Sequence, residues 1–448
     1  MKRGSTGKGR TRPRRLPAAR AIALAVGAIC AACSSTCNPP GSAAGSAARS
    51  PRTASAAEDG AQAEGEQGDD GESAGPERPE TARAWTTFRG SALRNGRSPV
   101  RGPRRAKPKW VFRTQGRIYA DAAVRPDGTL LVASHDGNLY AVGTDGREIW
   151  SYDLQGKIWT SPAVGRDGTI YVGSDADRLV ALSPDGDPRW TFSTERPPPE
   201  GESASAGLWD VDTSPLLLAD GTVVFGCHTD LIALRPSGSQ RWSFEAGAGG
   251  AKIFSSPAAA PDGTIYFGTQ GDFFFALDSA GEVRWHLETG GDNDGTPAVG
   301  DDGTVYFGSD DGELRAIAPG GTPRWIADIG APLRAPLAVA HDGTVLAPTY
   351  GSRPFVVALD GRSGEEKWRF EIEPGKGDFY GIQSGPLVDG EDYVYFGGRD
   401  HFVYCLSPDG ELVWRHETGD QVDSGPVLAP DGTLYIGSDD HRLYAFAR

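Results

Sequence analysis

A unit of about 40 residues recurs along most of this 448-residue chain. Three copies show it plainly: SPAVGRDGTIYVGSDADRLVALSPDGDPRW from Ser161, TPAVGDDGTVYFGSDDGELRAIAPGGTPRW from Thr296 and GPVLAPDGTLYIGSDDHRLYAF from Gly425. Within a unit, four apolar or alternating runs are separated by turn signals such as Pro-Asp-Gly, which predicts four short strands. The abundance of glycine (62 residues) and proline (33 residues) fits many short strands joined by tight turns.

Two features mark the repeat and count its copies. A tryptophan near the end of the unit and an Asp-Gly turn in its first half each recur eight times. The tryptophans are Trp110, Trp150, Trp190, Trp242, Trp285, Trp325, Trp368 and Trp414. The turns begin at Asp127, Asp167, Asp220, Asp262, Asp302, Asp342, Asp389 and Asp431. Eight units of four strands predict an all-β, eight-bladed β-propeller, in which each tryptophan is a structural wedge between blades with its indole N–H on a backbone carbonyl.

The two ends of the repeat region complement each other. The last unit has three strands and stops at Arg448, whereas the first tryptophan segment, residues 109–113, precedes the first complete unit. Pairing this spare strand with the last unit would close the ring and remove exposed strand edges. We therefore expect closure of the last blade by an N-terminal strand, within a propeller that covers residues 108–448.

The N-terminus is typical of an export signal of the lipoprotein type, which we predict over residues 1–32. Residues 1–20 are basic, and residues 21–32 (AIALAVGAICAA) are apolar but too short to span a membrane, since twelve helical residues rise only about 18 Å. The small residues before Cys33 resemble a bacterial lipobox, which implies lipidation of Cys33 and, with Ser34 next, sorting to an outer membrane. Ordinary cleavage followed by secretion is the alternative.

Composition separates two further segments from the propeller. Residues 33–84 are rich in Ala, Gly, Ser, Pro and Glu and contain no aromatic residue, so we expect a disordered acidic tether. Residues 85–107 form a segment ahead of the propeller. The formal net charge is −15 even though residues 1–32 hold eight basic residues and no acid. So acidic a body argues against binding to nucleic acid and limits membrane contact to the lipid anchor.

Residues 358–368 (ALDGRSGEEKW) and 171–174 (YVGS) resemble the tryptophan-docking repeat of the quinoprotein alcohol dehydrogenase-like (PQQ-like repeat) propeller family, and the likeness covers residues 108–448. The run WTTFRG at residues 85–90, with Asn95-Gly96, resembles the segment that precedes the propeller in non-enzymatic members. The architecture resembles that of propeller lipoproteins that support outer-membrane protein assembly, which implies docking of a protein partner. Fold resemblance alone does not carry function.

The same resemblance raises the question of a cofactor. The family's dehydrogenases hold a quinone beside a calcium ion, commonly under a disulfide between adjacent cysteines. This chain has no adjacent cysteine pair, and Cys227 and Cys405 belong to the third and seventh units, too far apart to bridge. The run at residues 292–295 (DNDG) lacks the full ligand set of a calcium loop. We therefore predict no cofactor, no metal site and no catalytic residue.

One face of the propeller is expected to carry the binding site. The connections from the fourth strand to the next unit, and from the second strand to the third, open on the same face and vary in sequence, whereas the opposite turns are short and uniform. Variable loops in a compact repeat are commonly functional. Aromatic and acidic residues just before the first strands would ring the mouth of the central channel. The candidate binding residues are Tyr119, Trp159, Trp209, Asp212, Phe254, Asp294, Arg334, Tyr380, Gln383 and Asp423.

These observations favour binding over catalysis. The favoured interpretation is an exported, lipid-anchored propeller at the outer membrane, on its periplasmic side or at the cell surface, that acts as a scaffold for an envelope protein. The alternative is a receptor that takes a small molecule or a glycan at the channel mouth. A quinone-dependent dehydrogenase is the third hypothesis.

Overall fold

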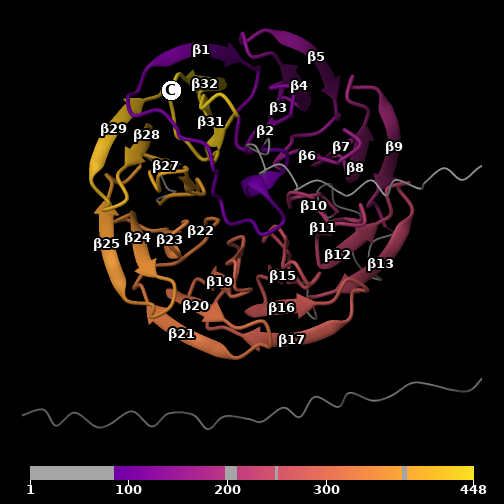
Figure 1. Cartoon of the computed structure of the whole chain (residues 1–448). Helices are drawn as coiled ribbons and strands as arrows, with labels where there is room; N and C mark the ends of the chain where they lie inside the picture. The colour runs from indigo at the N-terminus through magenta and orange to yellow at the C-terminus, as the bar shows by residue number, and fades with distance from the viewer. Residues whose placement is uncertain (1–84, 197–208, 248–250, 376–380) are drawn as a thin grey trace, which may run out of the picture. The chain divides into compact units, whose positions relative to one another are not determined.

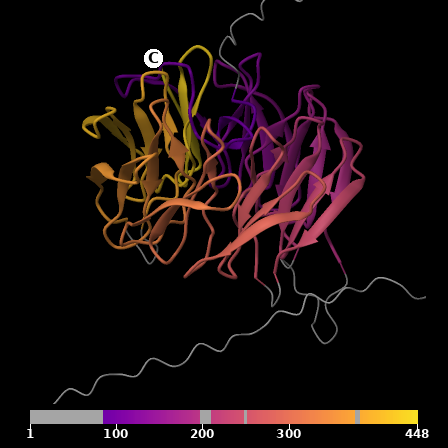
Figure 2. The same ribbon diagram turned by 60° about the horizontal axis from the view of Figure 1, so that its bottom comes forward.

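The computed structural model describes residues 85–196, 209–247, 251–375 and 381–448. In these ranges, 32 strands form eight antiparallel four-stranded sheets. The sheets stand as blades around a central axis (Figure 1), and in side view their strands run between two faces that carry the connections (Figure 2). The predicted all-β, eight-bladed propeller is confirmed. No helix in the described part of the chain is long and apolar enough to cross a membrane. The export signal, Cys33 and the tether lie outside the described residues.

Within each blade, the strands follow one another from the centre to the rim. Blades one to four consist of β2 (Ala123–Val124), β3 (Leu130–Ala133), β4 (Asn138–Val142), β5 (Glu148–Asp153); β6 (Ala163–Val164), β7 (Ile170–Ser174), β8 (Arg178–Leu182), β9 (Pro188–Ser193); β10 (Leu216–Leu217), β11 (Val223–Cys227), β12 (Asp230–Leu234), β13 (Gln240–Glu245); and β14 (Ala258–Ala259), β15 (Ile265–Gly268), β16 (Phe273–Leu277), β17 (Val283–Glu288).

Blades five to seven consist of β18 (Ala298–Val299), β19 (Val305–Gly308), β20 (Glu313–Ile317), β21 (Pro323–Asp328); β22 (Ala338–Val339), β23 (Thr344–Pro348), β24 (Phe355–Asp360), β25 (Glu366–Glu371); and β26 (Leu387–Val388), β27 (Val394–Gly397), β28 (Phe402–Leu406), β29 (Leu412–Glu417). Blade eight contains β30 (Val427–Leu428), β31 (Leu434–Ser438), β32 (Arg442–Phe446) and, at its rim, β1 (Pro108–Arg113).

Burial explains the sequence of each strand. The second strands are apolar because both of their faces are covered; β7, for example, is buried along its whole length. The fourth strands form the outer rim, and β9 alternates between exposed and half-buried residues. The periodicity of the repeat therefore follows from the distance of each strand from the axis.

The tryptophans join neighbouring blades through a repeated contact. Their indole Nε1 atoms donate hydrogen bonds to backbone carbonyls: Trp110 to Thr144 (2.9 Å), Trp190 to Pro236 (2.9 Å), Trp242 to Ser279 (3.1 Å), Trp285 to Pro319 (2.8 Å), Trp325 to Gly361 (2.9 Å), Trp368 to Pro408 (2.9 Å) and Trp414 to Pro103 (2.9 Å). The ring of Trp150 lies against Gly186 in the same place. Under seven of these rings, all but that of Trp414, the turn carries a glycine with positive φ: at Gly281, φ is +87° and an added Cβ would lie 2.7 Å from the Trp242 ring.

The last blade is closed by the N-terminal strand, as predicted. β1 pairs antiparallel with β32, in a register that runs from Pro108 opposite Phe446 to Arg113 opposite Arg442. Phe112 of β1 is buried, and its ring centroid lies 5.5 Å from that of Tyr140 in blade one. The two ends of the described chain thus hold the ring together.

Residues 85–98, which we call the plug, pass through the centre of the ring, where the indigo chain crosses in Figure 1. They include the 3-10 turn η1 (Phe88–Gly90). Backbone carbonyls of the plug accept hydrogen bonds from the first strands of six blades: Val124 donates to Trp85 (2.8 Å), Val164 to Thr86 (2.8 Å), Ala259 to Ala92 (2.7 Å), Val299 to Leu93 (2.9 Å), Val339 to Asn95 (2.8 Å) and Val388 to Gly96 (2.8 Å). The segment ahead of the propeller in sequence therefore packs inside it.

Two fully buried arginines fasten the plug to the blades. Arg89 donates to the carbonyls of Gly385 (2.8 Å), Pro386 and Leu337 (3.3 Å), and Arg94 donates to those of Pro257 (3.1 Å), Pro215 (2.7 Å) and Phe88. Burial lowers the pKa of Arg89 to about 10 and that of Arg94 to about 9, and the carboxylate of Asp121 opposes both shifts. The plug thus places two cations at the centre of the ring, where the carboxylate of Asp121 from blade one interacts with both.

Candidate functional site

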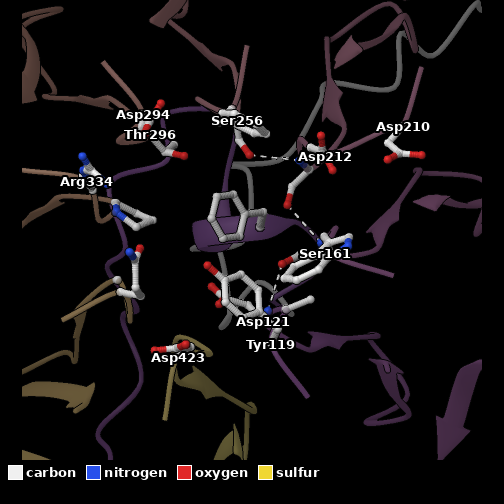
Figure 3. Close-up of a pocket in the computed structure, with 18 of the residues that line it drawn as sticks. Tyr119, Asp121, Ser161, Asp210, Asp212, Ser256, Asp294, Thr296, Arg334 and Asp423 are labelled. Carbon is white, nitrogen blue, oxygen red and sulfur yellow. Dashed lines mark hydrogen bonds between the residues drawn. The ribbon is translucent and has the colours of Figure 1, made fainter. Parts of the chain in front are cut away.

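A cavity of about 510 Å³ opens on the face formed by the connections between blades. Side chains from all eight blades line it, together with Phe88 of the plug (Figure 3). Its volume lies within the range of small-ligand pockets, about 300–1,000 Å³. The cavity is open on this face, and Phe88 of the plug lies among its lining residues. We call this cavity the cup.

The structure brings eight of the ten candidate binding residues together at the cup. These eight are Tyr119, Trp159, Asp212, Phe254, Asp294, Arg334, Gln383 and Asp423. Trp209 lies beside blade three, where its ring centroid is 4.9 Å from that of His228. Tyr380 lies outside the described residues.

Three further acids line the cup, and the sequence did not single them out: Asp121, Asp175 and Asp210. Asp121 occupies in the first unit the position that holds Ser161 in the second, so an acid in a column of small residues was the available signal. Asp175 lies in the connection between β7 and β8, and Asp210 follows Trp209 in a non-repeating insertion. Asp175 belongs to a repeat column, the aspartate of Gly-Ser-Asp, which recurs at Asp310 and Asp439, whereas Asp210 stands in the insertion.

A chain of hydrogen bonds fixes Asp121 in the cup wall. The Asp121 amide donates to Ser161 Oγ (2.9 Å), the Ser161 amide to Ser214 Oγ (3.0 Å) and the Ser214 amide to Ser256 Oγ (2.9 Å), as the dashed lines of Figure 3 show. On its other side, Asp121 Oδ1 accepts from the amide of Gly425 (2.6 Å). These bonds link blade eight through blade one to blade four.

The second oxygen of this carboxylate is unsatisfied. Asp121 is only 5 % exposed, and its Oδ2 has no hydrogen-bond partner within the described residues. Burial raises the pKa of Asp121 to about 6, although Arg89, Arg94 and the Gly425 amide all act to lower it. At neutral pH the cup therefore contains an ionised carboxylate with one oxygen left unpaired.

A second group of acids lies in the same cavity. Asp175, Asp210 and Asp212 each offer a carboxylate oxygen, and these oxygens lie within 4.8 Å of one another. Burial, followed by repulsion from Asp175, raises the pKa of Asp210 to about 7 and that of Asp212 to about 6. Such oxygens could hold a hard divalent cation such as Ca²⁺, and they attract cations in general.

An aromatic wall borders this acidic group. The Trp159 ring centroid lies 5.2 Å from that of Tyr119 and 4.1 Å from that of His135. Trp159 Nε1 donates to Asp175 Oδ2 at 3.0 Å. The hydrogen bond and the ring contacts together fix the orientation of the indole beside the carboxylates.

On another side of the cup, arginines are already paired. Arg334 contacts both carboxylate oxygens of Asp310, from Nε to Oδ1 (2.8 Å) and from Nη2 to Oδ2 (2.5 Å). Arg399 binds Asp423 in the same bidentate way, at 2.8 and 3.0 Å. Bidentate pairing holds these guanidinium groups in place and uses two nitrogens of each.

These residues do not fit an anionic quinone cofactor. Among the described residues that line the cup, Arg334 is the one cation, and it faces Asp310, whereas six aspartates line the same cavity. An anion would meet the unpaired Oδ2 of Asp121. Cys227 and Cys405 are free and buried in blades three and seven.

The chain is similar to one protein family in sequence and to several solved structures in fold. The family profile described as outer membrane protein assembly factor BamB matches residues 82–252 and 228–399. BamB from Moraxella catarrhalis is 19% identical, with a TM-score of 0.63 over 76% of this chain and 99% of that chain. A europium-containing methanol dehydrogenase is 13% identical (TM-score 0.68; 82% and 98% covered). Quinohemoprotein alcohol dehydrogenase from Comamonas testosteroni is 16% identical (TM-score 0.66; 81% and 80% covered). No curated protein sequence matches the chain.

At these identities the solved structures establish a shared fold and nothing about activity. The two profile matches are stronger evidence of kinship, because together they run from residue 82 to residue 399, well over half of the chain. The chain therefore belongs to the family of the outer membrane protein assembly factor BamB.

Proposed function

We propose that this chain is a protein-binding scaffold of the cell envelope. The observation that carries the proposal is the cup of a BamB-family propeller, where connections from all eight blades bring aromatic and acidic side chains together on one face. A rigid ring with variable loops on one face suits the docking of an extended segment from a partner protein. The partner is an envelope protein, and the acidic chain has no role in binding nucleic acid.

The proposal includes export and a lipid anchor. Residues 1–32 act as the signal, Cys33 carries the lipid at an outer membrane, and residues 33–84 tether the propeller. The support is the order of the basic, apolar and cysteine positions in the sequence. Replacing Cys33 with alanine should move the chain from the membrane fraction to the soluble fraction, and unchanged membrane partition would contradict the anchor.

Crosslinking in the native envelope tests the scaffold role. A photoreactive residue replaces Phe254, which is 36% exposed at the cup, and a control replaces Ile149, which is 59% exposed on the rim strand β5. We expect one recurrent protein adduct from position 254 and none from position 149. No adduct at position 254, or the same adducts at both positions, would refute docking at the cup.

A receptor for a small molecule or a glycan is the second candidate, and the volume of the cup favours it. Such a ligand would raise the melting temperature in proportion to RT ln(1 + [L]/Kd), whereas a scaffold responds to its protein partner. The proposal also holds that the chain is not an enzyme, because the carboxylates of the cup disfavour an anionic quinone. Reduction of an artificial electron acceptor in the presence of quinone, calcium and an alcohol would contradict it.

A further inference from the structure

We propose that the cup binds a guanidinium or alkylammonium group, presented as an arginine or lysine side chain on an extended segment of the partner. This inference rests on the proposed scaffold function and names the chemistry by which the partner is recognised. It follows from three features of the cup: its unpaired carboxylate oxygens, its fixed aromatic wall and the positions of its acids.

The first feature is a set of hydrogen-bond acceptors without donors. Four buried carboxylate oxygens from cup-lining residues have no hydrogen-bond partner within the described part of the chain: Asp121 Oδ2, Asp175 Oδ1, Asp210 Oδ1 and Asp294 Oδ1. Asp121 is 5 % exposed, so its carboxylate is built into the wall. Buried acceptors are normally satisfied, and a cation with several N–H groups would satisfy these.

The second feature is the aromatic wall. Trp159 is fixed by its hydrogen bond to Asp175 and by its contacts with Tyr119 and His135. A fixed indole next to carboxylates can bind a cation through its ring face while the carboxylates accept the N–H groups. A planar guanidinium fits both kinds of contact, because it stacks on rings and donates in the plane.

The third feature separates an organic cation from a metal ion. A divalent ion would draw in Asp175, Asp210 and Asp212, but Asp121 and Asp294 lie on other sides of the cup (Figure 3). A metal held by the three acids would leave those two unpaired and would not use the aromatic wall. A side chain with several donors, entering from the open mouth, can reach acids on more than one side.

Direct titration of the full-length chain in detergent micelles tests the inference. The probe is N-acetyl-arginine amide at low ionic strength, and the control is N-acetyl-citrulline amide, which has nearly the same shape without the charge. We expect the arginine probe to bind by calorimetry and to raise the melting temperature, with binding of citrulline at least tenfold weaker. Equal binding of the two probes, or binding of neither, would overturn the proposal.

Three variants locate the bound cation. Asp212→Asn and Asp121→Asn should each weaken arginine binding about tenfold, which is the loss of one charge-assisted hydrogen bond. Trp159→Phe keeps an aromatic face but loses the N–H bond to Asp175, so we expect a smaller loss, about threefold. The control Asp185→Asn removes the same charge from an exposed turn on the opposite face and should bind as the unaltered chain does. If Asp212→Asn binds as tightly as that control, the assignment of the cup is wrong.

Two further arms distinguish the sources of the cation and the fate of the scaffold role. If spermidine binds more tightly than an arginine-containing peptide, a free amine is the ligand and the peptide assignment is overturned. If calcium chloride binds and the arginine probe does not, the site is a metal site instead. A protein adduct at position 254 without arginine binding would leave the scaffold role standing and remove this inference. Arginine binding without any adduct would keep the cation site but remove both the scaffold role and the partner segment.

Discussion

The contact between a docking tryptophan and the glycine beneath it can be tested with two substitutions in one blade. Gly281, in the turn between β16 and β17, has φ +87°, and a Cβ there would lie 2.7 Å from the Trp242 ring. Gly263, in the turn between β14 and β15, has nearly the same φ, +82°, but its nearest neighbour to a Cβ is Ser279 Cβ at 3.8 Å. Both glycines therefore need a positive φ, but only Gly281 lies against a tryptophan ring.

The expected cost follows from this difference. Alanine in the left-handed region costs about 1–2 kcal/mol at either site. At Gly281 the ring of Trp242 must also move, which adds about 1–3 kcal/mol of overpacking and weakens its 3.1 Å bond to Ser279. We expect Gly281→Ala to be less stable than Gly263→Ala by about 2–3 kcal/mol, or roughly 3–4 °C in melting temperature for a domain of this size.

Thermal unfolding of both variants, followed by tryptophan fluorescence, measures the difference. Repeating both substitutions in a Trp242→Ala background completes a double-mutant cycle, in which the extra cost at position 281 should disappear because the ring is gone. Equal melting temperatures for the two single variants would refute the argument that the indole sets the need for glycine at this turn. So would an extra cost that persists without the ring.

Three other predictions test the buried acids of the cup, the closure of the ring by β1 and the two buried cysteine thiols. Burial raises the folded-state pKa of Asp121 and Asp294 to about 6, so between about pH 4 and pH 6 the folded chain keeps protons that the unfolded chain has lost. The free energy of unfolding should therefore fall as pH rises from about 4 to 7, by about 3 kcal/mol from Asp121 alone. A melting temperature that rises over that pH range would contradict this prediction. Phe112→Ala in the closing strand should cost about 3 kcal/mol, since its ring is 8% exposed, and a loss below about 1 kcal/mol in denaturant unfolding would contradict closure by β1. Burial raises the pKa of Cys227 and Cys405 to about 12, so both should react with a thiol reagent at pH 8 only after unfolding, and fast native labelling would be the contrary result.

Repeat periodicity was enough to predict the fold because each strand of a blade meets the same surroundings eight times. The tryptophan column and the Asp-Gly turns fixed the number of blades, and the unmatched strand at each end predicted the pairing of β1 with β32. The plug could not be predicted in this way. Residues 85–98 occur once, and their backbone carbonyls meet first strands as far away as Val388. A segment bound through its backbone leaves little pattern in its side chains.

The cup shows the same limit at the level of single residues. Position in the repeat predicted that eight side chains would meet at the channel mouth, because equivalent positions lie at equivalent places around the axis. Asp175 comes from a connection that other units share, with Asp310 and Asp439 at the equivalent position, whereas Asp210 comes from an insertion, so only the folded chain brings the two near Asp212. The environment of the Asp121 carboxylate comes from the Gly425 amide, 304 residues later, and from two plug arginines outside the repeat, all of which lower its pKa.

The topology links the cup to closure of the ring. The wall at Asp121 is completed by the amide of Gly425, 304 residues later, and the plug is held by bonds such as that from Arg89 to Gly385, 296 residues later. We expect contacts this distant to form late in folding, because closing long loops costs entropy before the contacts repay it. The cup therefore exists only once blade eight has met blade one. A cation that binds the completed cup must stabilise the closed ring by the same free energy with which closure strengthens its binding. A substitution that loosens β1, such as Phe112→Ala, should then weaken arginine binding by the factor by which it lowers the closed fraction, although Phe112 is not among the residues that line the cup.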